Sequence, residues 1–363
     1  MGLQAKIVYD GGIITVPDAM GSPRSDQLVG TSAEQLCELA GRVCYDSLGT
    51  GRDSDAYFKH IVESNHLSVL GHFNFTFTID ALKEKAAYVL SSLLNRPGLF
   101  VNVQADGDYL LLTITSSLRV WAEWDLWTSR GCKDNDFVRQ KGLSAACYFA
   151  PTIFKHLGHT KSLTRQDESA FNNFPDEFQW VSMYLRMGRT ASHEQVRHGY
   201  RTAISQRSTR YCDESDSEII EHPLLVKATE SVYLPQFVVD ALALQLNRLK
   251  EVARSSYRDV NSLCSIAAKE AGVDPVTAKK QARGAARGFL RMATETDMIF
   301  SASLPQWAHM LRMRLHPAAD AEIRELYSMI LTELKSSYYS QYFSKFTTVN
   351  SPDGIGVVLK ETK

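Results

Sequence analysis

Residues 194–211 carry the densest group of charged and hydrogen-bonding side chains in this sequence, and they constrain its fold most. The segment reads Glu-Gln-Val-Arg-His-Gly-Tyr-Arg-Thr-Ala-Ile-Ser-Gln-Arg-Ser-Thr-Arg-Tyr. Upstream, apolar residues recur at helical spacing, which predicts an amphipathic helix that ends near the charged group, with Gly199 as its stop. These apolar residues are Phe178, Val181, Tyr184, Leu185, Met187 and Ala191. Arginine forks beside serine hydroxyls and backbone N–H groups suit a phosphate and a planar ring that forms an anion.

A run of arginines taken alone is typical of a solvated helix end. The order of the residues distinguishes this one. The pattern resembles the signature of the flavin-dependent thymidylate synthases, in which Arg-His-x is followed, after about eight residues, by Ser-x-Arg-Tyr. That family has Arg at the third position, where this chain has Gly199, and Arg201 is the nearest arginine able to supply the missing charge.

Two more stretches resemble the same family, in the family's order. Residues 66–72, His-Leu-Ser-Val-Leu-Gly-His, resemble a His-x-Ser/Thr-x-x-Glu-His segment that leads into a strand, although Gly71 replaces the glutamate. Residues 311–325 resemble a late helix with the pattern Leu-Arg followed by Glu-Ile-Arg. Ser303-Leu-Pro stands where the family has Asn-x-Arg against the flavin, and Gly284 stands near a position that is often acidic. The resemblance therefore implies the family's fold and leaves the usual flavin contacts and substrate open.

Composition excludes several classes of protein. The chain has 363 residues, 44% hydrophobic and 22% charged, with a net charge of -1, so bulk charge does not favour binding to nucleic acid or to a membrane. It shows no membrane-length apolar run and no leader, so we expect a cytoplasmic protein. The six cysteines are scattered without a Cys-x-x-Cys pair and are expected to be free thiols. No metal site is expected, because His156 and His159 have no cysteine or carboxylate near them in sequence.

The periodicities predict a single α+β domain over residues 1–363, with a small antiparallel sheet early and a helical C-terminal half. A strand and turn are expected over residues 6–16, a helix from Thr31, and a half-buried strand over residues 73–79. An inserted elaboration at about 81–177 should hold a helix over 81–94, a β-hairpin over 99–115 and a helix over 117–127. Further helices are expected over 234–271, 277–293, 307–314 and 319–338.

Adding a carbon to C5 of a uracil ring requires that C5 become nucleophilic. One route adds a cysteine at C6, but no cysteine here lies in the Pro-Cys-His setting of the flavin-free thymidylate synthases. The other route stabilises negative charge at N3 and O4 of the ring, for which arginine is suited. Arg314 matches the family arginine placed against the pyrimidine, although by itself it reads as a surface arginine of a helix. Ser208 has no apparent His–Asp pair to activate it, so we assign it to substrate binding and ring polarisation.

The resemblance implies FAD as cofactor, NADPH as reductant and methylenetetrahydrofolate as carbon donor, in sites shared between subunits of a homotetramer. His66 lies near the expected folate face. The flavin-side positions are Ser68, Arg197, His198, Gly199, Arg201, Ser303 and His309. The substrate-side positions are Glu194, Arg197, Gln206, Arg207, Ser208, Arg210, Arg287 and Arg314, of which Arg314 and Ser208 are the catalytic candidates.

The sequence leaves the substrate open between dUMP, UMP or both. The departures at residues 71, 199 and 303–305, together with the insertion, favour a specialised relative such as a UMP/dUMP C5-methylase of nucleoside-antibiotic biosynthesis. A nucleotide-binding paralogue that has lost the flavin is the alternative of a different class. A nucleic-acid-binding protein is disfavoured by the near-zero net charge.

Overall fold

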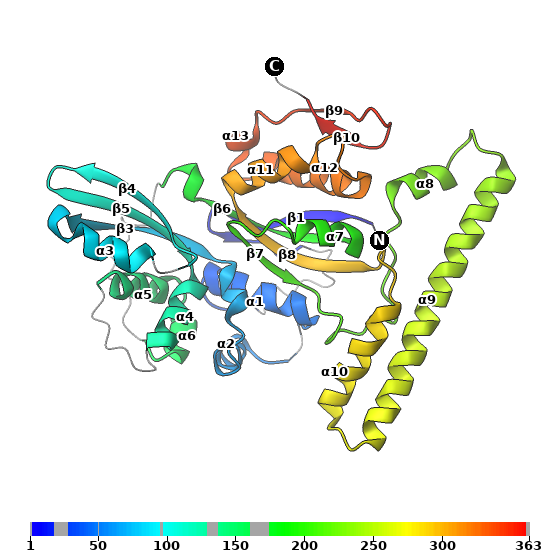
Figure 1. Cartoon of the computed structure of the whole chain (residues 1–363), viewed down its shortest axis with the longest axis horizontal. Coiled ribbons are helices and arrows are strands. Elements are labelled where there is room, and N and C mark those ends of the chain that lie inside the picture. Colours follow the sequence, from blue (N-terminus) through cyan, green and yellow to red (C-terminus); the bar gives the residue numbers. More distant parts are fainter. Residues whose placement is uncertain are drawn as a thin grey trace.

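The computed structural model describes residues 2–17, 28–49, 51–94, 97–128, 137–159 and 174–360. These residues form an α+β structure with antiparallel sheets and many helices, as the periodicities predict (Figure 1). Parts of the expected insertion at 81–177, and Cys132 within it, lie outside the described residues. The five described cysteines are free thiols.

The main sheet has five antiparallel strands in the order β2-β1-β6-β8-β7. β1 (Gln4–Asp10) turns through Gly11 and Gly12, both at positive φ, into the short β2 (Ile13–Ile14), as expected for this segment. β6 (Trp180–Gly188) pairs along its whole length with β8 (Glu295–Ser303), and β8 pairs on its other side with β7 (Thr202–Gln206). Strands from both halves of the chain therefore build one sheet, and the prediction of an early sheet followed only by helices is wrong.

The predicted amphipathic helix over residues 178–191 is also wrong. Residues 180–188 form β6, and only the short helix α7 (Arg189–Gln195) precedes the charged segment. Every residue of β6 is buried, because one hydrophobic cluster covers each face of the main sheet. Along β6, Ser182, Tyr184 and Arg186 alternate with apolar residues, so the strand period of two is present in the sequence beside the helical spacing.

A second sheet of three strands, in the order β3-β5-β4, lies beside the main sheet (Figure 1). β3 (Asn74–Leu82) confirms the expected half-buried strand, and β4 (Phe100–Asp106) with β5 (Tyr109–Ser117) confirms the expected hairpin. The helix expected from residue 81 begins later, because β3 continues to Leu82 and a 3-10 turn, η4 (Lys83–Lys85), precedes it. The helices around this sheet are α3 (Ala86–Leu94), α4 (Leu118–Thr128), α5 (Phe137–Phe149) and α6 (Pro151–His156).

Two helices and a 3-10 turn connect the N-terminal strands to the second sheet. α1 (Ser32–Tyr45) begins at the expected cap, where Thr31 and Glu34 form a reciprocal capping box. α2 (Ser54–Glu63) and η3 (Leu67–Gly71) follow, and η3 carries most of the segment that begins at His66. One face of the main sheet packs with α1 and the second sheet, and the other face packs with C-terminal helices.

The C-terminal half is mainly helical, as expected, but β8 crosses it and a small hairpin of β9 (Thr348–Asn350) and β10 (Val357–Leu359) ends it. The helix expected over 277–293 ends early, at Ala286, and η7 (Arg287–Phe289) follows. The remaining elements are η6 (Asp176–Phe178), α8 (Pro223–Thr229), α9 (Gln236–Glu270), α10 (Pro275–Ala286), α11 (Leu304–Arg314), α12 (Ala321–Ser336) and α13 (Ser340–Phe343).

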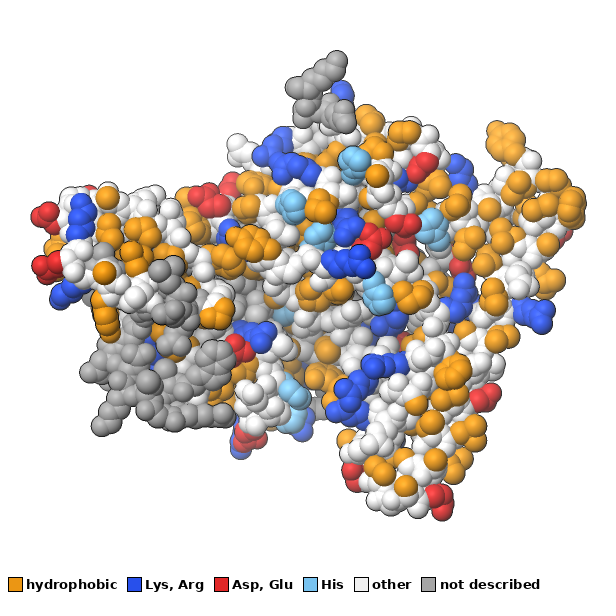
Figure 2. All heavy atoms as spheres, in the orientation of Figure 1, with side chains coloured by type: hydrophobic (Ala, Val, Ile, Leu, Met, Phe, Trp, Pro, Cys, Tyr) orange, Lys and Arg blue, Asp and Glu red, His pale blue; other side chains and the backbone are white. Residues whose placement is uncertain are grey.

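The long helix α9 and its neighbour α10 project from the body as a helical hairpin (Figure 1). Only Tyr257 of the 35 residues of α9 is buried. Hydrophobic side chains are exposed along the hairpin, as the orange spheres at the right of Figure 2 show. None of the described helices is both long enough and apolar enough to cross a membrane.

Candidate functional site

The pairing of β7 with the end of β8 creates a cavity of about 760 Å³. Its lining residues come from the segment after α7 and from α11, which begins where β8 ends. They are Arg197, His198, Gly199, Tyr200, Arg201, Ser303, Pro305, Gln306, His309, Met313 and Arg314. We call this the arginine–histidine cavity. Figure 2 shows basic and histidine side chains gathered at the centre of the face over α7, β7 and α11.

Arg314 is held from two sides at the end of α11. Its Nε donates to Nε2 of His198 at 2.9 Å, its Nη1 forms an ion pair with the Glu194 carboxylate, and its Nη2 donates to the Glu194 carbonyl at 3.1 Å. A guanidinium has five N–H donors, so these three bonds leave two for a ligand. Only 14% of the Arg314 side chain is exposed, which restricts its motion and strengthens its field.

His198 is neutral in this arrangement. Burial first, and then the positive charge of Arg314 and the neighbouring His309, lower the pKa of its imidazole to about 4. Because the arginine N–H can only donate, Nε2 of His198 must accept, which assigns the ring proton to Nδ1. The imidazole therefore orients Arg314 without adding charge to the cavity.

Gly199 and Arg201 both line the cavity. A Cβ atom added at Gly199 would meet no heavy atom within 4 Å, so the absent family arginine leaves open space. Arg201 has φ of 50°, and its guanidinium lies 4.6 Å from the ring centre of Phe100 and donates to the Glu177 carbonyl at 2.7 Å. Arg201 thus lies near the vacant position, but residues outside the family motif already hold its charged end.

Arg197, His309 and Ser303 complete the flavin-side set in this cavity. Arg197 and His309 are exposed. Ser303 is fully buried, and its Oγ has no hydrogen-bond partner among the described residues. The cavity therefore offers cationic and imidazole groups to one ligand.

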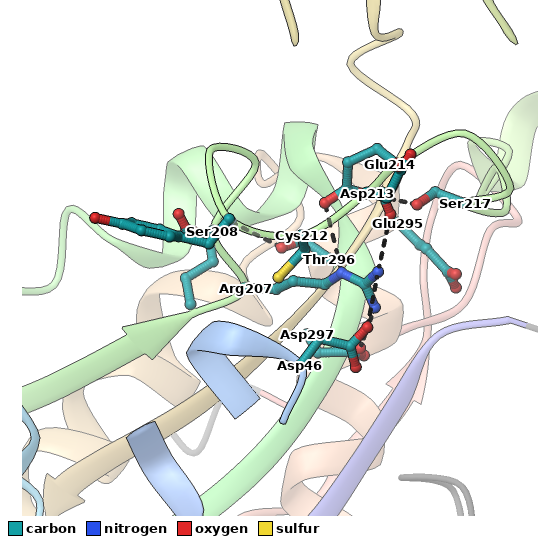
Figure 3. Close-up of polar contacts among 12 residues, drawn as sticks. Asp46, Arg207, Ser208, Cys212, Asp213, Glu214, Ser217, Glu295, Thr296 and Asp297 are labelled. Carbon is teal, nitrogen blue, oxygen red and sulfur yellow. Dashed lines mark hydrogen bonds and ion pairs between the residues drawn. The ribbon is translucent and has the colours of Figure 1, made fainter. Parts of the chain in front are cut away.

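The segment Arg207-Ser208-Thr209-Arg210-Tyr211 lies at the other end of β7, and we call it the serine loop. The Ser208 N–H donates to the Cys44 carbonyl at 2.9 Å, and the Ser208 carbonyl accepts from the Cys212 N–H at 2.9 Å. The first of these bonds ties the loop to the end of α1. Figure 3 shows Ser208 and Cys212 beside Arg207 and the carboxylates around it.

Three carboxylates enclose Arg207 (Figure 3). Its guanidinium lies 3.4 Å from Glu214, 3.3 Å from Asp46 and 3.9 Å from Asp297. Glu214 is 2% exposed and also contacts Arg189 at 3.5 Å. Burial raises the pKa of the Glu214 carboxyl, while Ser217 and the two arginines act to lower it. Arg207 is therefore a structural anchor of the serine loop.

Arg210 and Arg287 remain available to an anion at this end. Both are exposed, and neither side chain forms a hydrogen bond or ion pair with another residue of the described structure. Burial lowers the pKa of Arg189, with smaller contributions from Arg207 and Arg287, so these cations share one neighbourhood. Gln206 instead points at the protein, where its amide donates to Ser192 at 3.1 Å and Thr296 at 3.2 Å.

The site positions predicted from sequence fall into three groups in one protomer. The arginine–histidine cavity and the serine loop lie at opposite ends of β7, whose five residues span about 13–17 Å. Ser68 lies in a third hollow of about 320 Å³ with His66, Arg119 and Glu123. The chain therefore does not bring all the named residues into one pocket.

Sequence reasoning missed the residues that hold these groups in place. Asp46 directly follows α1, and Glu214 follows the serine loop, but nothing in their spacing indicates that they meet at Arg207. The same holds for the buried His72, whose ring nitrogens lie 2.8 Å from Ser301 Oγ and 2.9 Å from Ser205 Oγ. His156 and His159 contact separate carboxylates, Asp55 and Asp125.

The sequence profile of a family described as "Thymidylate synthase complementing protein" matches residues 27–86 and 169–338. The matched segments contain every residue that lines the arginine–histidine cavity and every residue of the serine loop. They also contain His66 and Ser68, which line the third hollow. Residues 87–168 fall between the two matched parts.

Curated relatives named flavin-dependent thymidylate synthase match about half of the chain. The relative from Mycolicibacterium gilvum is 31% identical over 178 residues, which is 49% of this chain and 66% of the relative. The relative from Mycobacteroides abscessus is 31% identical over 48% of this chain and 64% of its own length, and that from Mycobacterium tuberculosis H37Rv is 30% identical over 49% and 66%. This chain thus covers slightly less than two thirds of each relative's length.

A solved structure, described as a UMP/dUMP methylase PolB from Streptomyces cacaoi bound with 5-Br UMP, is also similar. The superposition covers 47% of this chain and 75% of that chain, at 16% identity and a TM-score of 0.33.

Proposed function

This chain belongs to the flavin-dependent thymidylate synthase family, and from that premise we propose that it catalyses the reductive C5-methylation of a uracil nucleotide, dUMP or UMP or both. FAD is the proposed cofactor, methylenetetrahydrofolate the carbon donor and NADPH the reductant. One observation carries the proposal: seven positions that the family resemblance singled out, some of them departures from its motifs, line a single cavity. They are Arg197, His198, Gly199, Arg201, Ser303, His309 and Arg314.

The residues of the arginine–histidine cavity suit a flavin dinucleotide. Arg197 and Arg201 supply positive charge for a pyrophosphate, and His309 supplies an exposed imidazole beside them. When bound, the flavin supplies the reducing equivalent that converts a transferred methylene into a methyl group. No residue of this chain is a hydride donor, so that part of the chemistry requires a cofactor.

Arg314 is the proposed catalytic residue. Its two remaining N–H donors are suited to a uracil ring, where they stabilise negative charge at N3 and O4 and make C5 nucleophilic. Glu194 and His198 act as positioning residues, because they fix the guanidinium before substrate arrives. A held guanidinium avoids reorganisation during the reaction, which is the main advantage of a preorganised site.

The serine loop is the proposed phosphate and sugar site, with Ser208, Arg210 and Arg287 as its ligands. The available arginines there, and the cage that holds Arg207, support this assignment. The serine loop and the cavity that contains Arg314 lie at opposite ends of β7, whose five residues span about 13–17 Å. We therefore propose that sites are completed between subunits of a homotetramer, and the exposed apolar face of α9 supports such an assembly.

We also propose that the chain is one domain in which residues 81–177 are an elaboration of the core. The gap in the family match at 87–168 supports this, as does a hydrophobic cluster that joins Leu36 of α1 to Trp121 and Phe154 of the extra region.

The decisive experiment measures methylation of dUMP and UMP side by side, with FAD, methylenetetrahydrofolate and NADPH supplied. We expect a yellow protein, or one that binds added FAD, and a C5-methylated product from at least one nucleotide. A protein that binds nucleotide but neither binds FAD nor forms product would instead be the non-catalytic paralogue.

A further inference from the structure

Phe100 connects the region that the family profile leaves unmatched to the arginine–histidine cavity. It begins β4 and pairs with Thr115 of β5, so the hairpin fixes the position of its backbone. It falls in the gap at 87–168 between the two matched segments. Its side chain is half-buried and contacts Tyr200 and Arg201, which both line the cavity. A residue from the extra region therefore supports one wall of the candidate site.

The Phe100 ring makes two contacts of defined geometry. The guanidinium carbon of Arg201 lies over the ring, 4.6 Å from its centre, which is within the range of a cation–π interaction. The Tyr200 ring lies at 85° to that of Phe100, with 5.9 Å between the ring centres. Both arrangements are attractive, because an aromatic ring is negative at its faces and positive at its edge. Phe100 is therefore placed to hold Arg201, with Tyr200 supporting the ring from the side.

Arg201 has few other contacts that would fix its charge. Its Nη2 donates to the Glu177 carbonyl at 2.7 Å, and its Nε is buried without a hydrogen-bond partner among the described residues. Burial lowers the pKa of this guanidinium, although arginine stays charged in proteins. Its φ of 50° is uncommon for a residue with a Cβ atom, so the surrounding contacts must select this conformation. Phe100 and the Glu177 carbonyl are therefore the contacts that keep this charge at the cavity wall.

The extra region also approaches the matched segments at a second place. Arg119 of α4 lines the third hollow beside Ser68. A Cβ atom added at Gly71 would lie 4.0 Å from Arg119 Cδ and 3.5 Å from the Cβ of Ala203 in β7. The extra region thus faces the chain near both of its glycine departures from the family motifs, at residues 71 and 199.

We propose that Phe100 is a positioning residue for the ligand of the arginine–histidine cavity. It holds the Arg201 guanidinium at the cavity wall, where the cation meets an anionic group of the ligand. Gly199 leaves open space there, so no side chain at that position supplies the charge in place of Arg201. The inference rests on the proposed function, in which the ligand is FAD and its anionic group is the pyrophosphate, and it gives the region at 87–168 a role in binding.

Fluorescence titration of FAD into the full-length protein tests this role. Phe100→Leu keeps an apolar side chain but removes the ring, and it should weaken FAD binding about fivefold, a typical effect of losing a partly desolvated cation–π contact. Phe100→Tyr restores the ring and should recover most of the lost affinity. Tyr109→Leu is the matched control, because it removes an exposed ring from the other end of the same hairpin, and it should leave the affinity unchanged.

A double-mutant cycle separates positioning from a general effect on the fold. Because the ring acts through the guanidinium, Phe100→Leu should have little further effect on FAD binding in the Arg201→Ala background. Additive losses in that background, or equal FAD affinities for wild type and Phe100→Leu, would overturn the inference and leave the proposed function in place. A wild-type protein that binds no FAD would overturn the proposed function, and this inference with it.

Discussion

Arg314 shows how one residue gains a role from its neighbours. An exposed arginine at a helix end usually contributes little, but here Glu194 and His198 fix the guanidinium at the wall of a cavity. Because these contacts fix the guanidinium in place, substitutions of Arg314 by alanine and by lysine can separate the loss of its charge from the loss of its planar geometry.

Arg314→Ala should lower the rate of methylation by about 10²–10³, the usual cost of losing a preorganised charge that stabilises a transition state. Arg314→Lys should also be slow, because a point charge cannot replace a planar fork that contacts two ring atoms. Arg312→Ala is the control on the same helix, since Arg312 does not line the cavity. Single-turnover kinetics give the measurement. Near wild-type rates in Arg314→Ala would mean that the active site has been assigned to the wrong residues.

Arg201 and Gly199 form a pair that tests the flavin site. Arg201→Ala should weaken binding of FAD or nucleotide by about 1–3 kcal/mol, as expected for a lost charge-assisted hydrogen bond. Gly199→Arg should tighten FAD binding, because the side chain enters open space and restores the family's charge. Fluorescence titration of FAD and calorimetry with dUMP and UMP measure both effects. Unchanged dissociation constants in Arg201→Ala would show that its contacts with Phe100 and Glu177 serve the fold alone.

Glu322 provides a test of pH dependence. It is 2% exposed and accepts the Gly188 N–H at 3.1 Å, and burial raises the pKa of its carboxyl to about 7. Between about pH 4.5 and 7 the folded state binds more protons here than the unfolded state, so this group's contribution to stability is lost as the pH rises. Glu322→Gln should therefore gain stability relative to wild type at pH 8 but not at pH 5, by about 2–3 kcal/mol. Urea unfolding at both pH values measures it, with Glu325→Gln of the same helix as the control; a pH-independent difference would contradict the shifted pKa.

At the scale of elements, local signals predicted well wherever one local rule dominated. The capping box at Thr31 fixes the start of α1, alternating residues give β3, and the Ala-Asp-Gly-Asp turn gives the β4–β5 hairpin. The errors lie where two spacings fit the same residues. In β6, Ser182, Tyr184 and Arg186 alternate with apolar residues at the period of a strand, but the apolar residues of this stretch also recur at helical spacing.

The candidate site also has one part that the sequence could predict and one part that it could not. Motif order named seven residues that line one cavity, because a family resemblance carries information about tertiary structure that spacing does not. Spacing alone could not predict that Asp46, Glu214 and Asp297 would surround Arg207, since three distant segments meet there. The family resemblance assigns Arg207 to the substrate, whereas its position among these three carboxylates favours a structural role.

At the scale of the whole molecule, α9 is the element that the single chain leaves unexplained. Its 35 residues extend about 52 Å, yet only Tyr257 is buried. Most helical stability in proteins comes from packing an apolar face, so a long helix with exposed Phe237, Leu244 and Leu263 requires a partner. A second copy of the chain is the partner that we propose, because it would also bring the separated site groups together.

Charged substitutions on α9 should therefore break the assembly and the active site together. Leu263→Glu combined with Leu244→Glu would bury carboxylates at the proposed interface, at a cost large enough to dissociate it. Light scattering after size exclusion should show a tetramer for wild type and smaller species for the variant, with loss of FAD binding and turnover. Lys269→Glu, at an exposed position in the last turn of the same helix, controls for charge alone. A monomeric wild type that binds FAD and methylates the nucleotide would contradict the proposal that active sites are shared between subunits. A single chain would then have to bring the serine loop to Arg314 by a conformational change.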